Sequence, residues 1–167
     1  MSESILKVED LRMHFPVKEG ILMRASRHNR AVDGVSFSIQ AGETMGLVGE
    51  SGCGKSTLGR CIARLYNPTS GRIVFDGTDI TRLRGKALLP YRKDIQMIFQ
   101  DPMESLNARH TVGDILEEPF IIHRIGTKAE RAQKVRGLLD TVGLPARSVT
   151  RYPFEFSGGQ RQRIGIA

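Results

Sequence analysis

Residues 49–57 combine glycine, lysine and hydroxyl side chains at a spacing that suits the binding of a phosphate chain. The segment reads Gly49-Glu50-Ser51-Gly52-Cys53-Gly54-Lys55-Ser56-Thr57 and contains the pattern G-x-x-x-x-G-K-[ST]. Glycines allow a tight backbone curl that points successive amide N–H groups into one concavity. Lys55 is then expected to contact the β- and γ-phosphates of a nucleotide, and the Ser56 hydroxyl to hold Mg²⁺.

The residues around this segment place it between a strand and a helix. Residues 44–48 form a short apolar run that suits a strand. After the loop, apolar side chains recur at offsets 0, 3, 4 and 7, which is one face of an α-helix: Leu58, Cys61, Ile62 and Leu65. A helix that begins here adds the positive end of its dipole to an anion site. This order favours a phosphate-binding loop over a plain glycine-rich turn.

The composition indicates a globular, cytosolic protein. The chain has 167 residues, of which 40% are hydrophobic, and this is enough for an apolar core. No apolar run approaches the roughly 20 residues of a membrane span, and the first four residues do not resemble a signal peptide. Cys53 and Cys61 show no metal-ligand spacing, so we expect two free thiols.

The formal net charge of +7 raises the question of a nucleic-acid partner or an anionic membrane surface. The basic residues are scattered, however. The densest group, at 24–30, has no interleaved aromatic side chains on which bases could stack. We therefore expect no nucleic-acid partner and read this group as a solvated loop, with contact to phospholipid as the second interpretation.

Alternating segments before the loop predict two antiparallel strands, at residues 5–15 and 35–39. Pro16 is expected to end the first strand, and residues 17–30 to form an exposed connection. After the first helix, residues 72–77 read as a further strand.

An apolar run at residues 95–99 is expected to join residues 44–48 in a parallel core. Between these runs, residues 83–91 predict a short helix that Pro90 breaks.

The remainder of the chain is predicted to be helical. Apolar spacing indicates helices within residues 111–123 and 127–142, and Thr127 with Glu130 forms a capping box for the second. Ser157 is expected to cap a third helix, which runs to the last residue. We therefore expect a helical part to follow a strand-rich part.

Three motifs together give the chain a resemblance to the ATP-binding subunits of ABC transporters. They are the loop at 49–57, the segment Ile98-Phe99-Gln100-Asp101-Pro102, and Phe156-Ser157-Gly158-Gly159-Gln160, which is similar to the LSGGQ signature of that family. Phe156 stands where the family has leucine. Within the family, residues 31–37, Ser105-Leu106-Asn107 and Tyr152-Pro153 look most like dipeptide and oligopeptide importers.

The resemblance implies an α/β fold of the P-loop NTPase class, with an N-terminal antiparallel β part and a helical subdomain. It implies a nucleotide-binding part at residues 1–104, a helical subdomain at 105–156, and the start of the signature helix at 157–167. The rest of such a domain would be missing, so the fold is expected to be incomplete at its C-terminus.

The resemblance also implies roles for single residues. Residues 49–57 would bind ATP, Phe15 would stack on its adenine, and Gln100 would contact Mg²⁺ and sense the γ-phosphate and attacking water. Cys53 would contribute only its backbone amide. The signature residues would face the γ-phosphate of ATP on a partner subunit: Ser157, Gly158, Gly159 and Gln160. The simpler interpretations are a half-buried strand residue for Phe15, an ordinary strand-end glutamine for Gln100, and a self-contained helix cap at Ser157.

The implied partners are transmembrane permease subunits and a second ABC ATPase subunit, at the cytoplasmic face of the cell membrane. Two such domains would enclose two ATP molecules and drive uptake of peptides or related small solutes. The family's Asp-Glu strand end and switch histidine have no match up to Ala167, so residues 1–167 are expected to hydrolyse little ATP. The alternative is a non-transport ABC ATPase acting in DNA repair or translation.

Overall fold

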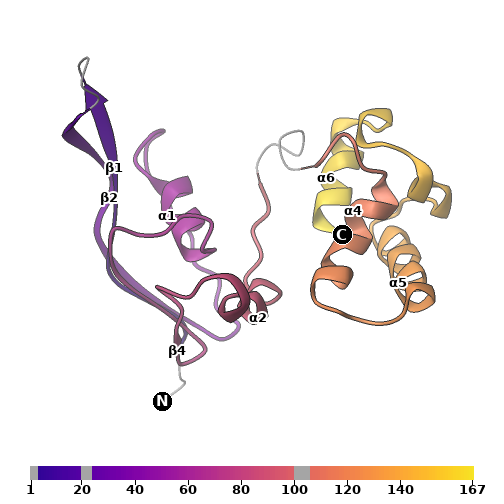
Figure 1. Ribbon diagram of the computed structural model, residues 1–167, viewed down its shortest axis with the longest axis horizontal. Helices are drawn as coiled ribbons and strands as arrows, with labels where there is room; N and C mark the ends of the chain where they lie inside the picture. The colour runs from indigo at the N-terminus through magenta and orange to yellow at the C-terminus, as the bar shows by residue number, and fades with distance from the viewer. Residues whose placement is uncertain (1–3, 20–23, 100–105) are drawn as a thin grey trace. The chain divides into compact units, whose positions relative to one another are not determined.

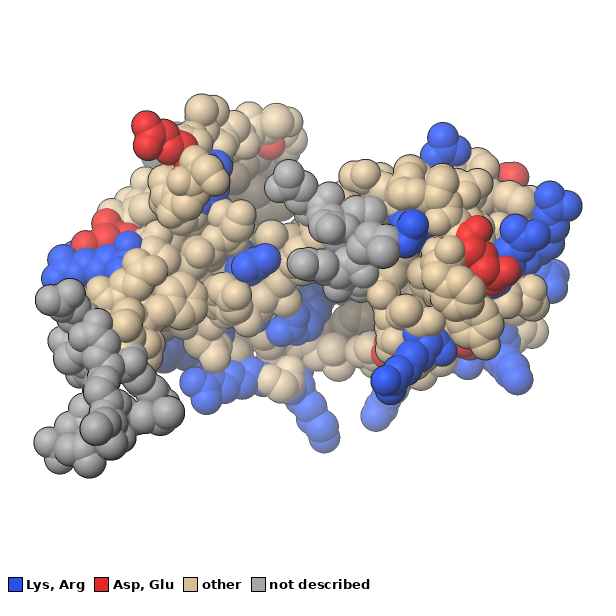
Figure 2. All heavy atoms as spheres, turned by 90° about the horizontal axis from the view of Figure 1, so that it is seen from above, with Lys and Arg blue, Asp and Glu red and all other residues tan. Residues whose placement is uncertain are grey.

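The computed structural model describes residues 4–19, 24–99 and 106–167 (Figure 1). The chain divides into two compact units, residues 1–97 and residues 98–167. Each unit has its own cluster of buried apolar side chains. Figure 2 shows lysine and arginine side chains scattered over the surface of both units, with acidic side chains between them. Within the described residues, no helix is long and apolar enough to cross a membrane.

The first unit is built on an antiparallel sheet in the order β2-β1-β3-β4. Its strands are β1 (Ser4–Glu19), β2 (Arg24–Gln40), β3 (Ser70–Phe75) and β4 (Thr78–Asp79). β1 is central and pairs with β2 along its whole length, and with β3 from Leu6↔Phe75 to Arg12↔Ser70. The two predicted N-terminal strands and the predicted strand at 72–77 are confirmed.

The prediction that Pro16 ends the first strand is wrong. β1 continues to Glu19, with Pro16 opposite His28 and Val17 opposite Arg27. Residues 17–19 and 24–30 are therefore paired strand residues, and the prediction of an exposed connection is wrong for them. Pairing between β1 and β3 ends at Arg12, and beyond that point β1 has one neighbouring strand in the described sheet. Proline has no backbone N–H to donate. It is tolerated at this position because a strand with a neighbour on one side only does not need hydrogen bonds on both sides.

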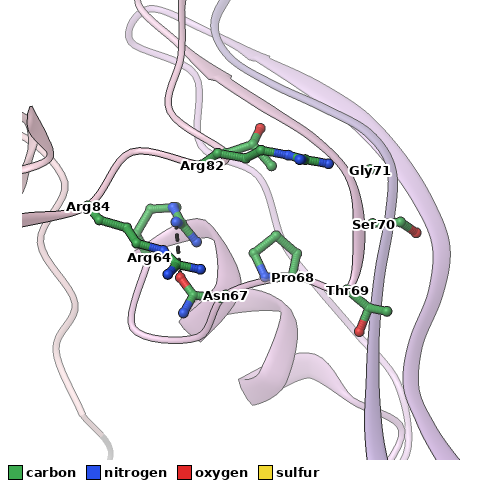
Figure 3. A pocket seen from close by; sticks show the side chains of 9 residues that line it. Arg64, Asn67, Pro68, Thr69, Ser70, Gly71, Arg82 and Arg84 are labelled. Carbon is green, nitrogen blue, oxygen red and sulfur yellow. Dashed lines mark hydrogen bonds between the residues drawn. The ribbon is translucent and has the colours of Figure 1, made fainter.

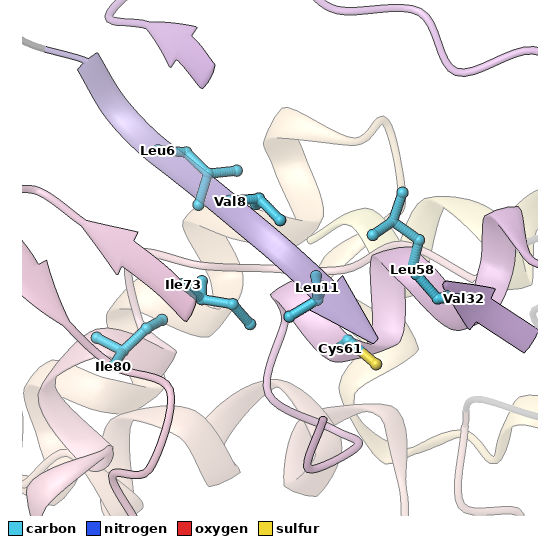
Figure 4. Close-up of a cluster of buried hydrophobic side chains, with 8 residues drawn as sticks. All are labelled: Leu6, Val8, Leu11, Val32, Leu58, Cys61, Ile73 and Ile80. Carbon is cyan, nitrogen blue, oxygen red and sulfur yellow. The ribbon is translucent and has the colours of Figure 1, made fainter. Parts of the chain in front are cut away.

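The core of the first unit lies between the sheet and helix α1 (Lys55–Ile62). Figure 4 shows the buried side chains of this cluster, which are Leu6, Val8, Leu11, Val32, Leu58, Cys61, Ile73 and Ile80. Leu58 and Cys61 are the buried residues of α1, and Ile62 packs against the cluster. Leu65 lies beyond the end of α1 and is 44% exposed, so the predicted apolar face is confirmed only as far as Ile62. Burial raises the pKa of the Cys61 thiol, so this side chain stays protonated and packs as a small apolar group.

The predicted parallel core does not form among the described residues. Residues 44–48 and 95–99 have no regular strand structure, and Val48 and Ile98 are 94% and 62% exposed. A strand needs a neighbour that accepts and donates its backbone hydrogen bonds, and a parallel sheet also needs cover on both faces. Neither segment has a paired strand in the described sheet, whose pairings are all antiparallel.

Short helical turns follow β4 in the first unit. A 3₁₀ turn, η1 (Gly85–Ala87), leads into α2 (Leu89–Arg92). Pro90 lies in the first turn of α2, where its missing N–H breaks no helical hydrogen bond. Short helical turns within residues 83–91 are thus confirmed, but the prediction that Pro90 breaks the helix is wrong, because Pro90 lies at the start of α2.

In the described part of the second unit, residues 106–167, three α-helices pack around one core. They are α4 (Val112–Ile122), α5 (Lys128–Thr141) and α6 (Gly158–Ile166). Two 3₁₀ turns, η2 (Ala146–Thr150) and η3 (Pro153–Glu155), connect α5 to α6. The buried cluster comprises Val112, Leu116, Val135, Leu139, Leu144, Phe156 and Ile164.

Each of these helices begins with a capping box. The side chains of Thr111, Thr127 and Ser157 each accept a hydrogen bond from the backbone N–H three residues later. The side chain of that later residue in turn accepts from the N-cap backbone N–H. The predicted caps at Thr127 and Ser157 are confirmed.

Candidate functional site

The loop before α1 requires glycine at its last position. Gly54 is the N-cap of α1 and has a φ of 97°, in the left-handed region. A Cβ atom here would lie 2.0 Å from the carbonyl oxygen of Ala31 on β2. The loop therefore passes directly against the sheet, and a side chain at Gly54 would push it away.

Lys55 holds its ammonium group over this loop. Its Nζ donates to the carbonyl oxygens of Gly49 and Glu50, at 2.7 and 2.6 Å, and lies 3.5 Å from Cys53 Sγ. These contacts keep a positive charge next to the backbone that a phosphate chain would follow. In this structure the ammonium contacts the loop itself, and its predicted contact with the β- and γ-phosphates stays a prediction.

The N-terminus of α1 leaves backbone donors available. Gly54 provides no side-chain cap, and the first turn of α1 has no acidic residue. The first intrahelical hydrogen bond runs from Leu58 N to the Gly54 carbonyl oxygen, at 2.8 Å. In the described part of the chain, the backbone amides of Lys55, Ser56 and Thr57 have no hydrogen-bond acceptor. Uncapped amides at the positive end of a helix dipole form an anion site.

The residues present fit a nucleotide phosphate chain with Mg²⁺. The Ser56 hydroxyl is exposed and makes no hydrogen bond to another described residue, so it is available as an oxygen ligand. The described residues contain no group of three or more His, Cys, Asp or Glu side chains that could hold a metal ion by itself. Gln100, the second predicted Mg²⁺ ligand, lies outside the described residues.

Phe15 forms an aromatic contact that the sequence did not reveal. Its ring meets the ring of Tyr66 edge to face, with centroids 5.8 Å apart and an interplanar angle of 84°. The guanidinium of Arg60 lies 5.7 Å from the Tyr66 ring centroid. Phe15 is half-buried, and its role in adenine stacking stays a prediction. Tyr66 lies beyond the end of α1, where helical spacing gives no signal for the contact.

The signature residues lie at the N-terminus of α6, in the other compact unit. The Ser157 Oγ accepts from the Gln160 backbone N–H at 3.4 Å, and the Ser157 N–H donates to Gln160 Oε1 at 3.0 Å. Gly158 and Gly159 are exposed, and an added Cβ at either would meet nothing within 4 Å. Buried Phe156 and Ile164 anchor the helix. Residues 49–57 thus lie in the first unit and the signature residues in the second.

Comparison with known proteins identifies the family of this chain. The profile of the ABC transporter family matches residues 32–167. The chain is 54% identical over 166 residues to the oligopeptide transport ATP-binding protein AppF of Bacillus subtilis (strain 168), covering 99% of this chain and 50% of AppF. It is 52% identical over 169 residues to OppF, the oligopeptide transport ATP-binding protein of the same strain, covering 100% of this chain and 53% of OppF.

A solved structure agrees in fold. The dimeric bacterial ABC transporter cassette MJ0796 superposes with a TM-score of 0.81 at 29% identity, over 96% of this chain and 67% of that one. The chain belongs to the ABC transporter family, as an ATP-binding domain. It spans about half the length of the two curated relatives above.

Proposed function

We propose that the chain is the nucleotide-binding part of an ATP-binding subunit that powers the import of peptides or related small solutes. The observation that carries this proposal is the loop at 49–57, where a lysine ammonium and uncapped helix amides converge. The peptide assignment is supported by the similarity to AppF and OppF, which are oligopeptide transport ATP-binding proteins. A glutathione import ATP-binding protein, GsiA of Pectobacterium atrosepticum, is also 49% identical over 166 residues, covering 99% of this chain and 27% of GsiA.

In the proposed site, each loop residue has one task. The amides of Lys55, Ser56 and Thr57 bind phosphate oxygens, while Gly54 keeps the helix end close to the sheet. The Lys55 ammonium moves from the loop carbonyls to the β- and γ-phosphates, exchanging neutral acceptors for charged ones. Mg²⁺, when bound at Ser56, neutralises charge on the β- and γ-phosphates. Gln100 completes this arrangement in the proposal, and Phe15 stacks on the adenine.

The proposed partners are a permease in the membrane and a second ATP-binding subunit, at the cytoplasmic face. The signature residues of one subunit then face the γ-phosphate held by the loop of the other, with Ser157 and the dipole of α6 providing the anion contacts. The solved cassette MJ0796 is dimeric and has also been obtained with ADP and Pi bound. In this arrangement, closure of the dimer transmits ATP binding to the permease.

The first test is nucleotide binding by residues 1–167, measured by titration calorimetry with MgATP. Lys55→Ala removes hydrogen bonds to charged oxygens, so we expect binding to weaken at least about tenfold. Lys93→Ala, which removes an exposed lysine after α2, is the matched control and should bind like the parent chain. Equal affinity of the Lys55→Ala chain and the parent would refute the role of the loop. We expect turnover by residues 1–167 alone to be negligible, because they contain no match to the family's general base.

The second test is transport. The full-length protein, reconstituted with its permease in vesicles, should couple ATP consumption to peptide uptake, and Lys55→Ala should abolish both. Peptide uptake that persists in the Lys55→Ala protein would contradict the transport proposal. Recovery of ribosomes or DNA with the protein, in place of a permease, would indicate the non-transport class.

A further inference from the structure

A hollow of about 490 Å³ lies in the first unit. The loop at 49–57 contributes none of its lining residues. Three of its nine lining residues are arginines, Arg64, Arg82 and Arg84, and none is acidic. Figure 3 shows Arg84 reaching toward Arg64 and Asn67, with Arg82 lying along another side toward Gly71. The arginines come from distant parts of the chain, because Arg64 follows α1 while Arg82 and Arg84 follow β4. The fold thus gathers positive charge that the sequence separates.

Arg64 is a buried cation without a carboxylate partner among the described residues. Arg64 is only 4% exposed. It donates to the carbonyl oxygens of Ile80, Tyr66 and Leu83 and to Asn67 Oδ1, at 3.0–3.2 Å. All four acceptors are neutral. Burial lowers the pKa of the Arg64 guanidinium, and the nearby charges of Arg84 and Arg92 act in the same direction. A desolvated charge held only by neutral dipoles strongly attracts an anion.

The arginine and asparagine side chains that line the hollow keep several N–H groups without an acceptor among the described residues. Arg64 uses four of its five N–H groups, one on Nε, one on Nη1 and two on Nη2. Arg82 and Arg84 are exposed and have no hydrogen-bond or ion-pair partner in the described part of the chain. The Asn67 side chain accepts from Arg64 through its oxygen, so its NH₂ group remains available. The occupant must therefore supply several acceptors.

We propose that this hollow binds a phosphate group, at a site separate from the loop at 49–57. Arg64, Arg82 and Arg84 supply the charge, and the Asn67 amide supplies a neutral donor. The planar guanidinium groups of Arg82 and Arg84 match the oxygen spacing of a phosphate, which each can bind through two parallel N–H···O bonds. Arg64 contributes its charge and its one remaining N–H group. The exposed rim arginines admit the anion, and the buried Arg64 fixes it at the base. Two sources share this chemistry, a soluble phosphate compound and the headgroup of an anionic phospholipid.

The test is a titration of the isotope-labelled 167-residue chain with inorganic phosphate, followed by two-dimensional NMR at constant ionic strength. The arginine Nε–Hε signals of Arg64 and Arg84 report on the hollow, whereas the backbone amides of residues 54–57 report on the loop. Phosphate at the hollow should shift both arginine signals in a saturable way. Shifts confined to the loop amides, or equal shifts with chloride alone, would overturn the proposal.

A double substitution supplies the matched comparison. Arg82→Gln with Arg84→Gln removes two exposed charges and should preserve the fold, checked by circular dichroism. Phosphate affinity at the Arg64 signal should fall about tenfold or more, since each lost charged hydrogen bond weakens binding by roughly that factor. Lys86→Gln with Lys93→Gln makes the same change in net charge at exposed positions outside the hollow and should leave the affinity unchanged. Equal losses in both double variants would show that net charge alone attracts phosphate.

Vesicle sedimentation distinguishes the two sources. Vesicles of phosphatidylcholine with phosphatidylglycerol are compared with vesicles of phosphatidylcholine alone. If the parent chain and the lysine double variant sediment with the anionic vesicles and the Arg82→Gln, Arg84→Gln variant does not, the ligand is a lipid headgroup. Saturable phosphate binding without such retention identifies a soluble compound. Failure of both arms overturns the proposal, while MgATP binding at the loop remains a separate measurement.

Discussion

Two glycines with similar backbone conformations have different tasks in the loop at 49–57. Gly52 and Gly54 both lie in the left-handed region, with φ values of 84° and 97°. A Cβ at Gly52 would meet nothing within 4 Å, whereas a Cβ at Gly54 would collide with the backbone of Ala31. Gly52 therefore allows the backbone conformation of the loop, and Gly54 also allows the loop to pack closely against the sheet.

This difference predicts unequal costs of alanine substitution. Gly52→Ala should lower the free energy of unfolding by about 1 to 2 kcal/mol, which is the cost of a left-handed L-residue. Gly54→Ala should lower it further, and should weaken MgATP binding more, because the loop or Ala31 must move. Urea unfolding and calorimetry on the same two variants test this. Equal losses of stability in the two variants would mean that the backbone around Ala31 moves away from the added methyl group at little cost in free energy.

At the scale of elements, the features that depend on nearby residues were predictable. The capping box at Thr127 and the N-cap at Ser157 follow from residues within three positions of each other. The loop at 49–57 is a local pattern of the same kind. Each of these signals specifies its partner within one helical turn or one loop.

Features that need a distant partner were predicted less well. Residues 44–48 are apolar but have no paired strand, and apolar composition cannot reveal whether a neighbouring strand is present. Pro16 lies within β1 because that stretch has one paired side, which depends on where β3 ends. The hollow beside Arg64 depends on a return of the chain after β4, so spacing along the sequence gave no sign of it.

The capping box of α4 leads to a prediction about pH. The Thr111 hydroxyl donates to Asp114 Oδ2 at 2.6 Å, and the Thr111 N–H donates to the same oxygen at 3.1 Å. The hydroxyl contact, with the backbone bond, lowers the pKa of the Asp114 carboxyl below its ordinary value. A depressed pKa in the folded state means that ionised Asp114 stabilises the fold above its unfolded pKa. This stabilisation is lost as pH falls through the folded pKa.

Asp114→Asn should therefore destabilise the chain near pH 7, by roughly 0.3 to 1 kcal/mol for a charge at a helix N-terminus. The difference from the parent chain should shrink as the pH falls below about 4, because the parent loses the same charge. Urea unfolding at several pH values provides the measurement. Asp140→Asn is a suitable control, since the Asp140 carboxylate lies near the C-terminal end of α5 and has no partner among the described residues. A pH-independent effect of Asp114→Asn would contradict the assignment.

At the scale of the whole molecule, the described residues form two buried apolar clusters that share no residue. Ile73 is fully buried in the cluster between the sheet and α1, and Leu139 is fully buried among α4, α5 and α6. The proposed nucleotide loop depends on the first core, through α1. The signature helix depends on the second, through Phe156 and Ile164. Separate cores allow the two sites to be destabilised one at a time.

Two cavity-forming substitutions test this separation by hydrogen exchange. Leu139→Ala should lower the stability of the second unit by about 2 to 5 kcal/mol, the usual cost of truncating a buried leucine. Amides of α4, α5 and α6 should then exchange faster, while those of β1 and β3 keep their protection, because opening is local when cores are independent. Ile73→Ala should produce the reverse pattern and should also weaken MgATP binding, since α1 loses its packing against the sheet. If either substitution accelerates exchange equally in both units, the two cores unfold as one, and the signature helix cannot be destabilised without also disturbing the nucleotide loop.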